Sequence, residues 1–208
     1  MFYDYIIIGA GVAGLYAAYN IKKKYPDRTF IILEGDNIGG RARQAIFANH
    51  LVTTGAGIGR KNKDKYLIDL LNELKIKYGE FSIEPKYSFE HVNIKKITID
   101  LKNKFNELNR PRKTFKEFAL PILGADVYKR YVRTTAYTDF ENDDTEHVLY
   151  MYGIEDNACC WTALSISWNE LINQLIAKIG SSNIKVNSKV TKIRNNDIIS
   201  VFTDKKEY

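Results

Sequence analysis

The chain has 208 residues, of which 45% are hydrophobic and 27% are charged, and it carries a formal net charge of +6. This composition is typical of a soluble globular protein with one large domain or two small ones, and no apolar run approaches the ~20 residues of a membrane-spanning helix. The basic residues are spread along the chain without an aromatic–basic RNA-binding signature, so we expect no nucleic-acid or membrane partner and a cytoplasmic location.

The beginning of the chain follows the order of a dinucleotide-binding unit. An apolar run at 5–8 predicts a buried strand, the stretch 9–14 is rich in glycine, and apolar residues at helical spacing continue until Pro26. A second apolar run at 30–33 predicts another buried strand and ends at Glu34, which lies 20 positions after the last glycine of the turn. A strand, a glycine turn, a helix and a strand closed by an acid at this distance are what such a unit requires.

Each residue of the glycine turn has a physical reason to be there. Gly9 permits a tight turn out of the strand, Gly11 has no Cβ atom to keep a pyrophosphate away, and Gly14 lets the helix pack close to the sheet. Together with Ala13 they form a candidate phosphate-binding turn at a helix N-terminus, where N–H groups and a partial positive charge favour phosphate. Glu34 can accept hydrogen bonds from both ribose hydroxyls and would repel a 2′-phosphate, which disfavours an NADP-type ligand. The alternative is a plain turn followed by a solvated glutamate.

A second glycine pair, Gly39–Gly40, follows Glu34 and leads into Arg41 and Arg43. This pair would bring more backbone and a guanidinium fork to the same pyrophosphate, which an NAD half-site does not need but an extended, buried FAD does. At this point the sequence resembles the flavin-dependent amine oxidase family, which also includes protoporphyrinogen and phytoene oxidoreductases and polyamine oxidases. The resemblance implies that FAD is the cofactor and that Arg41 screens its pyrophosphate.

The stretch HLVTTGAGIGR, residues 50–60, resembles the next flavin-contacting segment of the family, in which a strand ends in a glycine-rich turn. The resemblance implies that the small residues Gly55, Ala56 and Gly57 lie beside the isoalloxazine ring. Two residues before them the family usually has an aspartate, whereas this chain has Thr53. A hydroxyl can replace some of the hydrogen bonds of a carboxylate but not its charge.

The stretch 167–193 resembles the family segment in which a helix is followed by two short strands. Apolar residues at helical spacing predict the helix, Gly180 is a candidate C-terminal cap, and alternating apolar residues predict the strands. The resemblance implies that the backbone of Val190 meets the adenine. One more strand is expected at 198–202.

The segment between these blocks is predicted to be mostly helical. An amphipathic helix is expected at 66–74, with Tyr66, Leu67, Leu70, Leu71 and Leu74 on its apolar face. A second is expected at 97–108, and a capping box at 114–117 opens a third helix that Pro121 limits. The family resemblance implies that this insertion forms part of a substrate domain. The adjacent Cys159 and Cys160 are expected to be reduced, buried thiols, and the histidines lack metal-ligand spacing, so no metal site is predicted.

The resulting prediction is an α/β fold: a Rossmann-like FAD-binding domain with a mostly helical insertion. We expect FAD-binding parts at 1–60 and 161–208 and, at 61–160, the insertion that forms an incomplete substrate domain. The resemblance implies an FAD-dependent oxidoreductase that oxidises an amine or a related small-molecule substrate by hydride transfer to the flavin. Because it covers only the N-terminal half of a family member, we expect a fragment or a chain completed by a second polypeptide, and we name no catalytic residue. A non-catalytic nucleotide-binding module and an NAD-dependent reductase are the alternatives.

Overall fold

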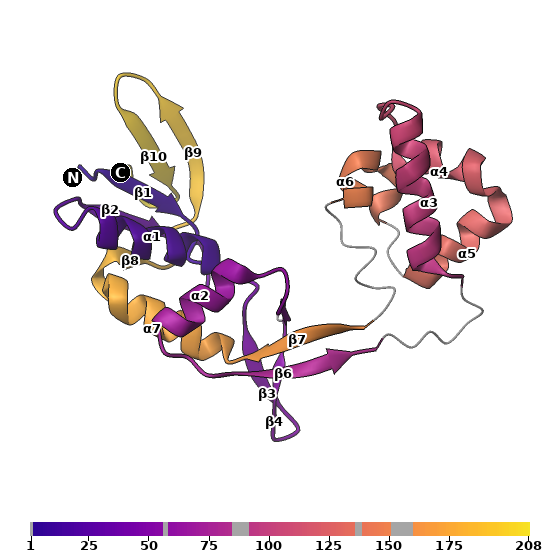
Figure 1. The fold of residues 1–208 in the computed structure, drawn as a ribbon. Coiled ribbons are helices and arrows are strands. Elements are labelled where there is room, and N and C mark those ends of the chain that lie inside the picture. The colour runs from indigo at the N-terminus through magenta and orange to yellow at the C-terminus, as the bar shows by residue number, and fades with distance from the viewer. Residues whose placement is uncertain (1, 56–57, 85–91, 136–138, 151–159) are drawn as a thin grey trace. The chain divides into compact units, whose positions relative to one another are not determined.

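The computed structural model describes residues 2–55, 58–84, 92–135, 139–150 and 160–208. The chain divides into two compact units, of which the first comprises Met1–Glu80 and Leu164–Tyr208 and the second comprises Phe81–Ala163 (Figure 1). The first unit therefore extends to Glu80, beyond the boundary at residue 60 that the sequence suggested.

The elements that lie within the first unit are β1 (Tyr5–Ile8), α1 (Val12–Lys24), β2 (Phe30–Leu33), β3 (Gln44–Phe47), β4 (His50–Thr53), β5 (Gly59–Arg60), α2 (Lys65–Glu73), α7 (Trp168–Ile179), η3 (Ser181–Asn183), β8 (Ile184–Lys185), β9 (Val190–Asn195) and β10 (Ile199–Thr203). The elements of the second unit are α3 (Ile94–Glu107), α4 (Phe115–Leu123), α5 (Ala125–Thr135), η1 (Asp139–Asn142) and α6 (Thr145–Tyr150). The strands that cross the boundary between the units along the chain are β6 (Tyr78–Ile83) and β7 (Trp161–Ile166).

A parallel sheet in the order β1-β2-β8 forms the centre of the first unit. Tyr5 of β1 pairs with Phe30 of β2 and Ile8 pairs with Leu33, so both predicted buried runs are strands in the predicted places. The central strand β2 is buried along its whole length, as a continuous apolar run in a parallel sheet requires. The carboxyl ends of β1 and β2 lead into the glycine turn and Glu34, the edge where sheets of this kind bind ligands.

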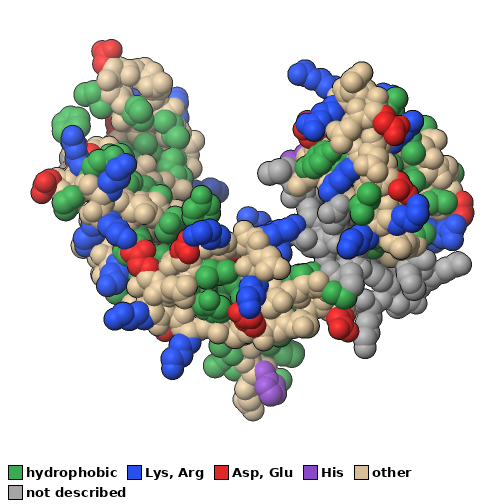
Figure 2. Space-filling model, in the orientation of Figure 1, with side chains coloured by type: hydrophobic (Ala, Val, Ile, Leu, Met, Phe, Trp, Pro, Cys, Tyr) green, Lys and Arg blue, Asp and Glu red, His purple; other side chains and the backbone are tan. Residues whose placement is uncertain are grey.

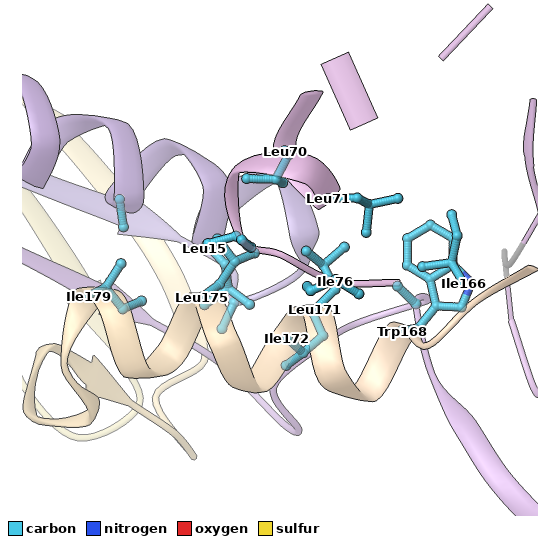
Figure 3. Packing of buried hydrophobic residues seen from close by; sticks show 14 of the residues in the cluster. Leu15, Leu70, Leu71, Ile76, Ile166, Trp168, Leu171, Ile172, Leu175 and Ile179 are labelled. Atoms are coloured by element: carbon cyan, nitrogen blue, oxygen red, sulfur yellow. The ribbon is translucent and has the colours of Figure 1, made fainter. Parts of the chain in front are cut away.

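The main core of the first unit lies between this sheet and the helices α1, α2 and α7 (Figure 3). Leu171, Leu175 and Ile179, which the sequence places on one face of a helix, are all fully buried on α7. They belong to the same cluster as Leu15 of α1 and Ile32 of β2. The helical periodicity of this stretch therefore predicted its core face correctly.

Helix α2 matches the helix predicted at 66–74, and Leu70, Leu71 and Leu74 are buried as expected. The prediction that Tyr66 shares this buried face is wrong, because 80% of this residue is exposed. Side chains in a helix point towards its N-terminus, and Tyr66 lies in the first turn of α2. The place of Tyr66 in the first turn is therefore consistent with its exposure, since few residues of the helix precede it.

The β9–β10 hairpin covers the other face of the parallel sheet. Val201 of β10 is buried in a cluster with Ile31 and Leu33 of β2, and Val190 packs against this cluster. The strand expected at 198–202 is observed one residue later, as β10.

The antiparallel hairpin of β3 and β4 turns through Ala48 and Asn49, which have φ values of +47° and +64°. Asparagine tolerates this left-handed conformation, which a two-residue hairpin turn requires. Ile46, Phe47 and Leu51 on its strands are 77%, 73% and 59% exposed. Figure 2 shows the hydrophobic side chains on the surface of this hairpin at the bottom of the view.

The second unit is helical and has a core of its own, so the predicted helical insertion is confirmed. Its largest fully buried side chains include Phe105, Phe115 and Tyr131, from three different helices. The capping box predicted at the start of α4 is present, with the Thr114 N–H donating to Glu117 and the Glu117 N–H donating to the Thr114 hydroxyl. Pro121 lies inside α4, which continues to Leu123, so the expectation that it limits the helix is wrong.

Other expectations drawn from the sequence concern its cysteines, metal ligands and membrane segments. Cys160 is exposed and disulfide-bonded, so the expected reduced, buried thiol is wrong at this position, and Cys159 lies outside the described residues. No helix in the described part of the chain is long and apolar enough to cross a membrane. Within the same residues, no three His, Cys, Asp or Glu side chains come together as a possible metal site.

Candidate functional site

The first glycine turn brings the end of β1 very close to the beginning of α1. Gly9 has a φ of +95°, a left-handed conformation that favours glycine. A Cβ atom on Gly14 would lie 2.0 Å from the backbone oxygen of Gly9, so only glycine allows the helix to approach this closely. A Cβ atom on Gly11 would meet nothing within 4 Å, which leaves open space over the turn.

The N-terminus of α1 is left without a side-chain cap. Gly11 is the N-cap residue, and the first turn of the helix contains no acidic residue that could answer its partial positive charge. The N–H groups in the first turn of a helix have no partner within the helix. This end of α1 is therefore suited to an anion such as a phosphate group.

Glu34 follows β2, and two backbone N–H groups, one from the glycine turn and one from the loop after β2, donate hydrogen bonds to its carboxylate. The Ala10 N–H donates a hydrogen bond of 2.6 Å to its Oε2 atom, and the Asp36 N–H donates one of 2.8 Å to its Oε1 atom. The half-buried carboxylate is thus fixed beside the glycine turn, with lone pairs left for further donors. Sequence reasoning assigned no role to Ala10, and the only signal that could have indicated one is its place between the first two glycines.

The second glycine pair lies directly against the first turn. The Gly39 N–H donates a 2.8 Å hydrogen bond to the Ala10 carbonyl oxygen, and Gly11 and Gly39 form an isolated parallel bridge. A Cβ atom on Gly40 would lie 3.3 Å from the Gly11 Cα atom, and Gly40 has a φ of +58°. Two glycine-rich segments that are far apart in the sequence therefore line one place in the fold.

A cavity of about 690 Å³ opens at this place, a volume in the range of small-molecule and cofactor sites. It is lined by Gly11, Val12, Ala13, Gly39, Gly40, Arg41, Ala42, Lys63, Asp64, Tyr66, Leu67 and Trp168. Sequence reasoning assigned no ligand role to seven of these residues, namely Val12, Ala42, Lys63, Asp64, Tyr66, Leu67 and Trp168. Only the three-dimensional arrangement brings α2 and the start of α7 to the glycine turns. Arg43, in contrast to Arg41, does not line the cavity.

Two further predicted site residues, Gly55 and Val190, lie in the described part of the chain. A Cβ atom on Gly55 would be 1.9 Å from the Arg41 carbonyl oxygen, which places the end of the 50–55 stretch against Arg41. Val190 lies two residues after Ser188, whose N–H donates a 2.8 Å hydrogen bond to the Glu34 carbonyl oxygen, so β9 begins close to Glu34 in the fold. Ala56 and Gly57 lie outside the described residues.

The parallel sheet, the glycine turn under α1 and the acid after β2 together define a Rossmann-like dinucleotide-binding fold. In agreement with this, residues 7–74 match the family model of the NAD(P)-binding Rossmann-like domain. An uncharacterized protein of Acanthamoeba polyphaga mimivirus is 28% identical over 76 residues, which are 35% of this chain and 15% of the viral protein.

Solved structures show the same fold over nearly the whole chain. A putrescine oxidase with bound putrescine has a TM-score of 0.71 at 16% identity, over 97% of this chain and 55% of its own. Cyclohexylamine oxidase from Brevibacterium oxydans has a TM-score of 0.68 at 16% identity, over 99% and 56%. A fatty acid isomerase from P. acnes that produces CLA has a TM-score of 0.64 at 16% identity, over 99% and 56%. The resemblance to amine oxidases is therefore confirmed for the fold, and the chain spans about half the length of these proteins.

Proposed function

We propose that this chain binds FAD at the glycine turns and serves in an oxidoreductase that oxidises an amine or a related small molecule. The proposal is carried by one observation, the contact of the second glycine pair with the first turn. An extended dinucleotide needs backbone without Cβ atoms on two sides of its pyrophosphate, and Gly11 and Gly40 supply such backbone here. The flavin of a bound FAD supplies the acceptor for the hydride that leaves the substrate.

The charges at the site fit the ADP portion of FAD. The uncapped N-terminus of α1 and the Arg41 guanidinium on the cavity wall would hold the pyrophosphate. Glu34 would accept hydrogen bonds from the ribose hydroxyls, because backbone amides already orient its two carboxylate oxygens. Its negative charge disfavours the 2′-phosphate of an NADP-type ligand.

An NAD-dependent reductase is the main alternative, since the glycine turn and Glu34 would serve NAD equally well. Arg41 and the Gly39–Gly40 pair favour FAD, because they add contacts that an NAD half-site does not need. A nucleotide-binding module without catalysis is the second alternative. A fatty acid isomerase shares this fold, and one fold can host different reactions. The proposal of an amine substrate is therefore supported by the sequence resemblance and by two structural neighbours that are named as oxidases of amines.

We also propose that the complete substrate site includes chain beyond these 208 residues, such as a second polypeptide. The solved structures with this fold are about twice as long as the chain, which supports the proposal. In the described part of the sheet, β1 pairs only with β2 and is therefore an edge strand. Ile8 at the end of this strand is apolar and 51% exposed. An apolar edge strand is a natural place for one more strand.

Ligand titration tests the proposed cofactor. We expect the purified chain to bind FAD more tightly than NADH in isothermal titration calorimetry and to retain a visible flavin spectrum. Tighter binding of NADH would identify the reductase alternative, and binding of neither ligand would remove the dinucleotide site. We further expect no amine-dependent peroxide from the FAD-loaded chain alone, since a complete site needs additional chain. Peroxide production with putrescine or cyclohexylamine would contradict that last point.

A further inference from the structure

The cavity at the glycine turns has a second wall that the proposed ADP contacts do not use. This wall comes from the loop before α2, from α2 itself and from the start of α7, and includes Lys63, Tyr66 and Trp168. Glu34, the proposed partner of the ribose, does not line this cavity. The cavity therefore begins at the proposed pyrophosphate position and extends on the side away from the adenosine.

Tyr66 is unusual among the residues of this wall because it is a large aromatic residue that is 80% exposed. Its neighbour in the sequence, Leu67, packs against the main core, so the helix that carries Tyr66 is anchored. The start of α2 is also fixed, since the Arg60 N–H donates a 2.7 Å hydrogen bond to Asp64 Oδ2 and the Asp64 N–H donates a 3.0 Å bond to the Arg60 carbonyl oxygen. The backbone of Tyr66 is thus held firmly, and the residue lines the cavity while most of its surface is open to solvent.

Trp168 gives the same wall a second, rigid aromatic surface. It is the first residue of α7, only 7% exposed, and belongs to the main core cluster (Figure 3). Aromatic side chains prefer stacked or edge-to-face contacts with other flat rings, and they lose little conformational entropy when they make them. A wall with one buried and one exposed aromatic ring, beside the charged Arg41 and Lys63, suits a flat ring that follows a phosphate.

We propose that Tyr66 stacks on the flat ring system at the far end of the bound dinucleotide, which is the isoalloxazine ring in FAD. In this role Tyr66 is a specificity residue, because it favours FAD over ADP, which has the same pyrophosphate but lacks the ring. The inference rests on the proposed function and deepens it, since it assigns the second half of the cofactor to a wall made by α2 and α7. It also gives a role to a tyrosine that was predicted in the core but is exposed and lines the cavity.

The test compares the dissociation constants of FAD and ADP in calorimetric titrations of wild type, Tyr66→Ala and Tyr66→Phe. Tyr66→Ala should weaken FAD by about twofold to tenfold, the range for an aromatic contact, and should leave ADP unchanged. Tyr66→Phe keeps a ring and should retain most of the FAD affinity. Tyr16→Ala is the matched control, because Tyr16 is an exposed tyrosine on α1 that does not line the cavity. Flavin fluorescence should be quenched by wild type and partly recovered by Tyr66→Ala.

The outcomes separate this inference from the proposed function. If wild type binds FAD but Tyr66→Ala leaves the ratio of the FAD and ADP affinities unchanged, the stacking role is wrong and the FAD site stands. Equal losses for both ligands would place Tyr66 at the pyrophosphate and would also overturn the inference. A Tyr66→Phe variant as weak as Tyr66→Ala would show that the hydroxyl acts, not the ring. If wild type binds neither ligand, the proposed function itself fails.

Discussion

Glu34 combines a structural and a binding role in one carboxylate. Its two oxygens accept hydrogen bonds from the Ala10 and Asp36 amides, and the same oxygens would accept hydrogen bonds from the ribose hydroxyls of the adenosine. Loss of charge-assisted hydrogen bonds of this kind costs about 1.5 to 3 kcal/mol, so Glu34→Ala should weaken FAD about tenfold to a hundredfold in calorimetric titrations. Circular dichroism must show that the variant remains folded, since the Ala10 amide also loses its partner. Unchanged affinity in a folded variant would reduce Glu34 to a structural residue of the turn.

Arg41 and Arg43 form a natural comparison, because they are the same residue type two positions apart. Arg41 lines the cavity and Arg43 does not. Arg41→Ala should therefore weaken FAD more than Arg43→Ala, and the wild-type affinity should fall more steeply with salt than that of Arg41→Ala. Titrations of the three proteins at low and high ionic strength measure both effects. A larger loss for Arg43→Ala would mean that the loop is oriented differently when the ligand is bound.

Gly14 sets the distance between α1 and the sheet. A Cβ atom there would lie 2.0 Å from a backbone oxygen of Gly9, which cannot rotate away. Gly14→Ala should lower the free energy of unfolding by about 1 to 3 kcal/mol or more, as overpacking does, in urea denaturation. Gly35→Ala is the control, because its Cβ atom would lie 3.4 Å from the side chain of Lys189, an ordinary contact. Equal stability of both variants would contradict the close approach of α1.

The elements that were predicted correctly are the ones whose pattern of apolar residues can be read from a short stretch of sequence. The apolar runs of β1 and β2 and the helical periodicity of α7 appear in the sequence itself, and the glycine turn between them has a recognisable order. The sequence predicted that the Gly39–Gly40 pair approaches the same pyrophosphate as the first turn, but it did not predict the direct bridge between Gly11 and Gly39, since nothing local pairs these residues. Tyr66 shows the limit of periodicity, because its spacing predicts a buried face but its place in the first turn of α2 exposes it. The strand β6 lies in a region expected to be helical, and its pairing with β7 joins distant segments.

At the level of elements, Asp4 joins the beginning of β1 to the segment that opens β2. It accepts hydrogen bonds from the Thr29 N–H and hydroxyl and from Arg28. The Thr29 N–H first, and then Arg28, lower the pKa of Asp4 from 3.8 to about 2. A carboxyl with a lowered folded-state pKa stabilises the fold above its unfolded pKa and loses this contribution as the pH falls from about 4 to about 2.

This lowered pKa gives a prediction for the pH dependence of stability. The difference in free energy of unfolding between wild type and Asp4→Asn should be largest at pH 5 to 7 and should shrink as the pH falls towards 2. Urea denaturation at several pH values measures this difference. Asp197→Asn, in the turn between β9 and β10, serves as the control. The loss of unfolding free energy between pH 5 and 7 should be larger for Asp4→Asn than for Asp197→Asn. A difference that stays constant from pH 7 to pH 3 would show that the Asp4 contacts do not persist in solution.

At the scale of the whole molecule, the main core cluster of the first unit and the core cluster of the second unit share no described residue. The core of the first unit is built from both ends of the chain, since Leu15 of α1 and Leu171 of α7 share one cluster. The core of the second unit lies entirely within Phe81–Ala163 and is centred on aromatic residues such as Phe115 and Phe140, whose ring centroids are 5.2 Å apart. A unit with a closed core of its own can lose and regain its structure independently of its neighbour.

This arrangement predicts that each unit unfolds on its own. Leu171→Ala leaves a cavity in the first core and Phe115→Ala leaves one in the second, and each should cost about 2 to 5 kcal/mol. Native-state hydrogen exchange should show faster amide exchange in β1, β2 and α7 for Leu171→Ala, with α3 to α6 unchanged, and the reverse for Phe115→Ala. Each variant is thus the control for the other. Since the proposed FAD site lies in the first unit, Phe115→Ala should also keep wild-type FAD affinity. Loss of protection across both units in either variant would show that they fold as one cooperative body, and the helical unit would then have to be intact for the glycine turns to bind a cofactor.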